Sequence, residues 1–173
     1  MSYYFIDPIT EHSDLQKLKE QIQKSEFVTE GTIIVNCSPD YSSIVCQSLQ
    51  HLLSEANNNK PLQLEYLDMP YPNQETYTKE QMILDAKKLM EKYKGQLKKF
   101  LFVDSGCLRG SNFTALAKVV SEYVGEEDRR FACLYLQDDS SFIPEFYVNT
   151  FNFEKNGGLL FWWENKNNPY WPW

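Results

Sequence analysis

The sequence contains no apolar run near the ~20 residues that a membrane-spanning helix needs. It also has no cluster of basic residues, and its formal net charge of -7 with a pI near 4.9 gives a negative far field. Such a field repels nucleic acid backbones and anionic membranes, so neither is expected as a partner. The first residues include no basic segment followed by an apolar one, which favours a cytoplasmic location over secretion.

Metal-ligand and nucleophile patterns are also scarce. The four cysteines show no CxxC spacing, which excludes the common zinc and redox motifs. They are Cys37, Cys46, Cys107 and Cys133. The two histidines, His12 and His51, lie far apart in helical contexts, so a Cys–His nucleophile pair is not expected. We expect buried free thiols and assign no metal ligand.

What the chain does contain is enough apolar surface for one core. Apolar residues make up 42% of its 173 residues, and 15% are aromatic. Short apolar runs predict strands at 32–36, 62–67, 100–103, 131–136 and 159–163. Helical spacing predicts helices at 15–22, 42–56, 82–93 and 113–124. Ser13 and Asp14 can cap the first helix, and the polar segment 70–78 is expected to be a mobile loop. This alternation predicts an α/β domain with a mostly parallel sheet flanked by helices.

One loop has the composition of a binding site. It follows the strand FLFV and leads into a helix, where free N–H groups favour anions. Its residues are Asp104, Ser105, Gly106, Cys107, Leu108, Arg109, Gly110, Ser111 and Asn112. The glycines allow close backbone approach, and Arg109 can neutralise part of a phosphate's charge. The loop matches neither of the common phosphate-binding motifs, GxxxxGK[ST] and GxGxxG. Many helix starts also contain Gly, Ser and Asn only as capping and turn residues, so a purely structural role stays open.

This loop and two later segments resemble type I phosphoribosyltransferases, in particular the small xanthine/guanine enzymes of purine salvage. In that family a strand of four apolar residues leads to two acids and a loop ending Thr/Ser-Gly-x-Thr, similar to FLFV, Asp104-Ser105 and 109–112. The family's Leu-Tyr-Tyr-Lys, Pro-Asp-Tyr-Tyr and Phe-Pro-Trp-Glu segments resemble 134–137 (LYLQ), 144–147 (PEFY) and 161–164 (FWWE). The resemblance implies one phosphoribosyltransferase-like domain over 1–173. Its expected parts are an N-terminal helix with part of a hood (1–30), a core (31–136), and a C-terminal hood and tail (137–173).

The resemblance also implies a chemistry, transfer of a phosphoribosyl group from phosphoribosyl pyrophosphate to a nucleobase with Mg²⁺. The resemblance makes Asp104 the catalytic candidate, because the acids at this position hold the ribose hydroxyls in the family. It also implies that residues 109–112 surround the 5′-phosphate. Gln137 and Leu159 fall at the expected base site.

Several positions depart from the family's pattern. Ser105 replaces the second acid, and Gln137 replaces a lysine that meets the purine. The segment 36–41 has no glycine and contains an acid where pyrophosphate should lie, and Gly158 falls near the stacking aromatic. These departures indicate a retained fold with altered activity.

Three hypotheses stay open, so the sequence does not decide whether the protein is an enzyme. The first hypothesis is a divergent Mg²⁺-dependent phosphoribosyltransferase. The second is a catalytically silent domain, which binds either a protein partner or a phosphorylated ribose such as phosphoribosyl pyrophosphate or a nucleoside monophosphate. The third hypothesis is an unrelated doubly wound domain of the flavodoxin type. No general acid or base is singled out among the candidates Glu75, Tyr77, Glu80 and Asp85.

Both chain ends are rich in aromatic residues. These are Tyr3, Tyr4, Phe5, Trp162, Trp163, Tyr170, Trp171 and Trp173. They either pack onto the sheet or form an exposed anchor for a homodimer or another protein partner.

Overall fold

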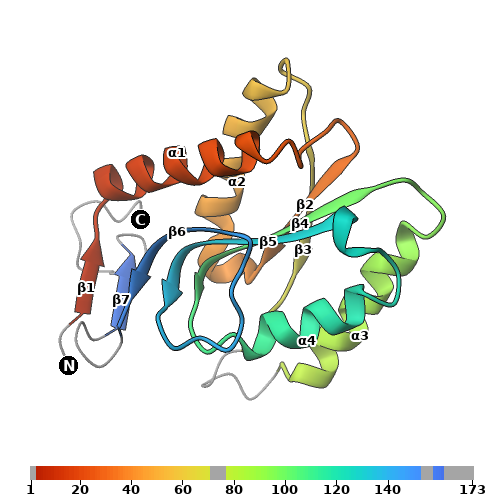
Figure 1. Cartoon of the computed structure of the whole chain (residues 1–173). Coiled ribbons are helices and arrows are strands. Elements are labelled where there is room, and N and C mark those ends of the chain that lie inside the picture. The colour runs from red at the N-terminus through yellow and green to blue at the C-terminus, as the bar shows by residue number, and fades with distance from the viewer. Residues whose placement is uncertain (1–2, 71–76, 153–157, 162–173) are drawn as a thin grey trace.

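The core of the protein is a five-stranded parallel sheet between two layers of helices, seen in a computed structural model that describes residues 3–70, 77–152 and 158–161 (Figure 1). Its strands are β2 (Thr32–Cys37), β3 (Gln63–Leu67), β4 (Lys99–Cys107), β5 (Arg129–Gln137) and β6 (Phe146–Phe151). The helices are α1 (Pro8–Lys24) and α2 (Pro39–Ala56) on one face, and α3 (Lys79–Lys92) and α4 (Ser111–Val120) on the other. The parallel α/β architecture expected from the sequence is thus confirmed. Within the described ranges, no helix is long and apolar enough to cross a bilayer.

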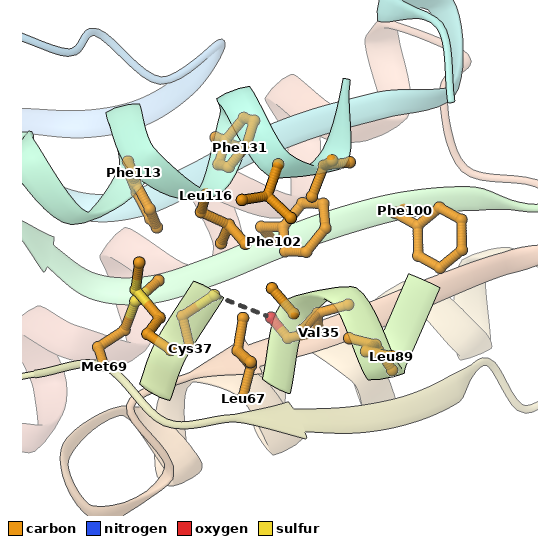
Figure 2. Packing of buried hydrophobic residues seen from close by; sticks show 14 of the residues in the cluster. Val35, Cys37, Leu67, Met69, Leu89, Phe100, Phe102, Phe113, Leu116 and Phe131 are labelled. Carbon is orange, nitrogen blue, oxygen red and sulfur yellow. Dashed lines mark hydrogen bonds between the residues drawn. The ribbon is translucent and has the colours of Figure 1, made fainter. Parts of the chain in front are cut away.

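Alternating side chains along the central strands divide the core into two layers. Leu101 and Val103 of β4 face α1 and α2, whereas Phe100 and Phe102 face α3 and α4. Figure 2 shows the second layer, in which Phe102 stacks on Phe131 with ring centroids 5.1 Å apart. Burial on both faces explains why these strands read as continuous apolar runs in the sequence.

A small second sheet pairs the beginning of the chain with its C-terminal part. Strand β1 (Tyr3–Ile6) runs parallel to β7 (Gly158–Phe161), and the pair lies at the left of Figure 1. The sequence predicted β7 but not β1. Of the aromatic ends, residues 162–173 lie outside the described residues.

The first helix begins earlier than its apolar spacing predicted. Asp7 caps it by accepting hydrogen bonds from the N–H groups of Ile9 and Thr10, and Pro8 occupies its first position. Expecting the start at Ser13 and Asp14 was therefore wrong. Asp14 instead lies buried in mid-helix, where it joins α1 to the sheet.

That connection is a polar cluster in an otherwise apolar layer. The Asp14 carboxylate accepts hydrogen bonds from the Tyr135 hydroxyl (2.7 Å), the Asn149 amide (2.7 Å) and Lys17 Nζ (2.9 Å). A buried carboxylate is tolerated only when it is bonded in this way. The cluster therefore fixes α1 against β5 and β6.

Two strands differ from the sequence prediction. Strand β6 lies in a stretch expected to be irregular, so the core sheet continues past residue 136. Strand β4 runs four residues beyond Val103, because Asp104, Gly106 and Cys107 keep their pairing with β5. The expected loop 104–112 is therefore half strand, and only residues 108–110 connect it to α4.

The order β3-β2-β4-β5-β6 reverses direction between β2 and β4. Because α2 and α4 cover opposite faces, the connections that follow these two neighbouring strands leave the sheet in opposite directions. Doubly wound sheets bind ligands at such a switch point. Flavodoxin-type sheets have the same order, so strand order alone does not distinguish between the hypotheses.

Candidate functional site

Asp104 lies at the switch point, near the carboxyl end of β4. Its Oδ1 accepts a hydrogen bond from the Ser105 N–H (2.7 Å), and its Oδ2 accepts one from the Ser38 hydroxyl of the neighbouring β2–α2 connection (3.2 Å). The Ser105 hydroxyl is 3.4 Å from Oδ1. Burial raises the pKa of Asp104 to about 7, although these hydrogen bonds lower it. The carboxylate is thus held in one orientation and changes charge near neutral pH.

The helix that follows begins without a side-chain cap. Gly110, in the left-handed conformation at φ 75°, is the N-cap of α4 and supplies no side chain to its first turn. The first intrahelical bond runs from the Thr114 N–H to the Gly110 carbonyl (2.8 Å), so the N–H groups of residues 111–113 have no acceptor within the helix. These donors and the positive end of the helix dipole favour an anion.

The turn between β4 and α4 is held by the β5–β6 connection. The Ser141 N–H and hydroxyl both donate to the Arg109 carbonyl, at 3.2 and 2.7 Å. A Cβ on Gly110 would lie 2.5 Å from the backbone nitrogen of Phe142. Contact with this second loop therefore fixes the backbone of the turn, while Leu108 and the Arg109 side chain stay exposed.

Three of the predicted binding residues make contacts within the protein. Ser105 and Cys107 are buried, and Cys107 Sγ lies 3.5 Å from the Ser140 hydroxyl. The Asn112 amide donates to the Pro70 carbonyl (3.0 Å), which joins the start of α4 to the β3–α3 connection. Ser111 is exposed at the first position of α4. Backbone groups therefore provide most of the donors near Asp104.

The cysteines lie on the central strands or, for Cys46 of α2, against β4, and none is activated as a nucleophile. Burial is the main cause that raises the pKa of Cys37, Cys46 and Cys133 well above the ordinary value, and the charge of Asp104 raises it further. The pKa of Cys107 is also raised, mainly by burial. Protonated buried thiols are poor nucleophiles and metal ligands. Within the described residues, no three His, Cys, Asp or Glu side chains form a group that could hold a metal.

The two predicted base-site residues, Gln137 and Leu159, belong to β5 and β7. A Cβ on Gly106 would be 3.9 Å from Cδ1 of Leu159, so β7 places this side chain over the end of β4. Gln137 ends β5, and its amide nitrogen donates to the Asp139 carboxylate. Gln137 and Leu159 thus flank neighbouring strand ends, and Gly158 pairs with Tyr3.

The acid and base candidates belong to the start of α3. The Tyr77 hydroxyl donates to Asp85, which also accepts from Gln81 and Lys88. The Lys88 hydrogen bond is the main reason that the pKa of Asp85 is lowered, and burial raises the pKa of Tyr77. The pKa of Glu80 is lowered, chiefly because its own backbone N–H donates to it. Glu75 lies outside the described residues.

Sequence reasoning missed Ser38, the residue that joins the β2–α2 connection to Asp104. This serine is buried, has φ 70°, and donates its N–H to the Leu67 carbonyl of β3 (3.0 Å). A serine at a strand end is too common to signal such a role. The contact depends on β2 lying beside β4, which the sequence does not state.

Comparison with known proteins identifies the fold. No family model matches the sequence, and no curated protein matches it. The purine phosphoribosyltransferase from Pyrococcus horikoshii Ot3 aligns with 95% of this chain and 95% of its own length, with a TM-score of 0.66 and 16% identity. The Helicobacter pylori xanthine-guanine-hypoxanthine phosphoribosyltransferase aligns with 94% of this chain and 92% of its own, with a TM-score of 0.61 and 16% identity.

A third solved structure is similar over the same length. It is a hypothetical protein from Neisseria gonorrhoeae with bound ppGpp, which aligns with 96% of this chain and 92% of its own at a TM-score of 0.65 and 14% identity. All three likenesses span at least 94% of this chain. The chain therefore has the phosphoribosyltransferase fold, as the sequence resemblance predicted.

Proposed function

We propose that the protein binds a phosphorylated ribose at the carboxyl ends of β2 and β4. Asp104 accepts hydrogen bonds from the sugar hydroxyls, and the N–H groups of residues 111–113 hold the 5′-phosphate. The observation that carries this proposal is the uncapped start of α4, which follows closely on an oriented carboxylate.

The other helices support this assignment by contrast. Helices α1 and α3 follow β1 and β3 rather than the two strands of the switch point, and each is capped by a side chain, Asp7 and Thr78 respectively. Helices α2 and α4 begin at the switch point, and neither has a side-chain cap. Ser38 is a residue type that usually caps a helix, yet its hydroxyl donates to Asp104. The chain thus leaves helix donors unfilled at the predicted ligand site.

The three similar structures point to the same class of ligand. Two are named as phosphoribosyltransferases of purine bases, and the third is described with bound ppGpp, a phosphorylated guanine nucleoside. A phosphorylated ribose is common to all three. Such a ligand also fits the cytoplasmic location that the sequence suggests.

Transfer of the phosphoribosyl group is the second candidate function, and Asp104 favours it as a polar group able to hold ribose. The residues present do not fit a protein-held Mg²⁺, however. Ser105 offers a hydroxyl in place of a second carboxylate, and no group of three His, Cys, Asp or Glu side chains among the described residues could hold a metal. Mg²⁺ sites in proteins rely on carboxylates together with substrate phosphates. Binding is therefore the function we put first.

Calorimetry tests the proposal. We expect ribose 5-phosphate to bind the wild-type protein with one site per chain, and Asp104→Asn to weaken this binding at least tenfold, because an amide cannot accept hydrogen bonds at both of its polar atoms. Glu127→Gln is the matched control, since it also removes one negative charge but lies exposed on the 3-10 turn after α4. Equal affinity of the wild type and Asp104→Asn would contradict the assignment.

A further inference from the structure

We propose that the ligand carries one phosphate group, on the 5′ carbon of its ribose, and no phosphate at C1. Ribose 5-phosphate and nucleoside monophosphates then bind, and phosphoribosyl pyrophosphate is disfavoured. This inference rests on the proposed function and narrows it. It is carried by the β2–α2 connection, which contacts Asp104 through Ser38.

The β2–α2 connection has fewer free backbone donors than the start of α4. The Ser38 N–H donates to the Leu67 carbonyl (3.0 Å), and Pro39, the first residue of α2, has no N–H. The Ser38 hydroxyl donates to Asp104. A second phosphate group needs several N–H donors or cations around it. The N–H groups of residues 40 and 41 are then the donors that precede the first intrahelical bond of α2, from the Ser42 N–H to the Ser38 carbonyl (2.8 Å), one fewer than at the start of α4. The start of α2 therefore offers a second phosphate fewer donors than α4 offers the first.

The charge of this region also opposes a second phosphate. The sequence has no lysine or arginine between Lys24 and Lys60, a stretch that contains all of β2 and α2. Asp40, at the second position of α2, adds a negative charge to this segment. A pyrophosphate at C1 would add negative charge close to Asp104 with no cation from this segment. Repulsion between like charges therefore disfavours phosphoribosyl pyrophosphate.

The connection is also fixed in this conformation from behind. Asn36 is fully buried, and its amide donates to the Ser43 hydroxyl (3.1 Å) while its oxygen accepts from the Ser42 hydroxyl (2.6 Å). Ser42 Oγ also lies 2.9 Å from the Ser38 carbonyl. Turning the Ser38 N–H toward a ligand would break its bond to Leu67 and disturb this buried network. The conformation of the β2–α2 connection, as well as its charge, therefore disfavours phosphoribosyl pyrophosphate.

Calorimetric titrations with ribose 5-phosphate, adenosine and guanosine monophosphates, and phosphoribosyl pyrophosphate test the inference, all with the same Mg²⁺ concentration. We expect phosphoribosyl pyrophosphate to bind at least tenfold more weakly than ribose 5-phosphate. Asp40→Lys should raise the affinity for phosphoribosyl pyrophosphate about tenfold and leave that for ribose 5-phosphate nearly unchanged. Glu55→Lys makes the same charge change in the last turn of α2 and should alter neither the affinity for phosphoribosyl pyrophosphate nor that for ribose 5-phosphate.

The outcomes separate this inference from the proposed function. If phosphoribosyl pyrophosphate binds as tightly as ribose 5-phosphate, or more tightly, the inference is wrong and the proposed function stands. If none of these ligands binds, the proposed function itself is wrong. If Asp40→Lys and Glu55→Lys change the relative affinities equally, the β2–α2 connection is not the source of the selectivity, and the inference is again wrong.

Discussion

Replacing Asp104 with asparagine should stabilise the protein at neutral and alkaline pH. Burial raises the pKa of Asp104 from 3.8 to about 7, so between these values the folded state holds a proton that the unfolded chain has lost. The free energy of unfolding therefore falls as the pH rises toward 7, and the loss is complete above it. Asparagine has no ionised form, can still accept from the Ser105 N–H, and can donate to Ser38.

The size of the effect follows from this pKa. Each tenfold change in proton affinity is worth about 1.4 kcal/mol, so the rise from 3.8 to about 7 corresponds to roughly 4 kcal/mol. Asp104 keeps some contact with solvent, which reduces the cost of ionising it in the folded state. We expect the variant to gain about 2 kcal/mol over the wild type at pH 8, and little at pH 4.

Urea denaturation at half-unit intervals from pH 4 to pH 8 measures this difference directly. Glu127→Gln is the control for loss of one exposed charge and should follow the wild type throughout. A constant difference between Asp104→Asn and the wild type across this range would refute the reasoning, because it would show that the carboxyl group does not titrate near pH 7. A variant less stable than the wild type at pH 8 would refute it as well.

Three further predictions concern the groups around the site. Gly110→Ala should destabilise the protein by about 2–4 kcal/mol in thermal unfolding, through left-handed strain and the clash with Phe142, whereas Gly95→Ala, with φ 77° and open space, should cost about 1 kcal/mol. Tyr135→Phe should cost about 1–3 kcal/mol, since it takes one donor from the buried carboxylate of Asp14, and the exposed Tyr66→Phe should cost almost nothing. The four buried cysteines should react with a thiol reagent at pH 7.5 only as fast as the protein opens, and all four at once in denaturant; rapid labelling of any in the native state would contradict their burial.

The sequence predicted the framework well where one physical signal dominated. Strands such as 100–103 are buried on both faces, so their composition alone identifies them. Helix α3 ends close to the predicted residue, because Gly95 follows it with φ 77°. Strand β6 was missed because it is a sheet edge with several half-buried positions and no continuous apolar run.

The candidate site was predicted only in part, for a similar reason. Local pattern placed Asp104 just past the end of a strand, whereas it lies within β4, three residues before that strand ends at Cys107, and at the switch point. The contact with Ser38 did not follow, because it joins residues 66 positions apart through the order of the strands. Burial of Ser105 was also missed, since it comes from β4 continuing past Val103 beside β5.

The most direct test of the account is a titration of the ¹⁵N-labelled protein with ribose 5-phosphate, followed by the backbone amide resonances. The account predicts saturable shifts of Ser111, Asn112 and Phe113 at the start of α4, together with Ser105. It predicts no comparable shifts at the side-chain-capped starts of α1 and α3. Unchanged resonances at residues 111–113 at saturating ligand, or larger shifts at the capped helix starts, would contradict it.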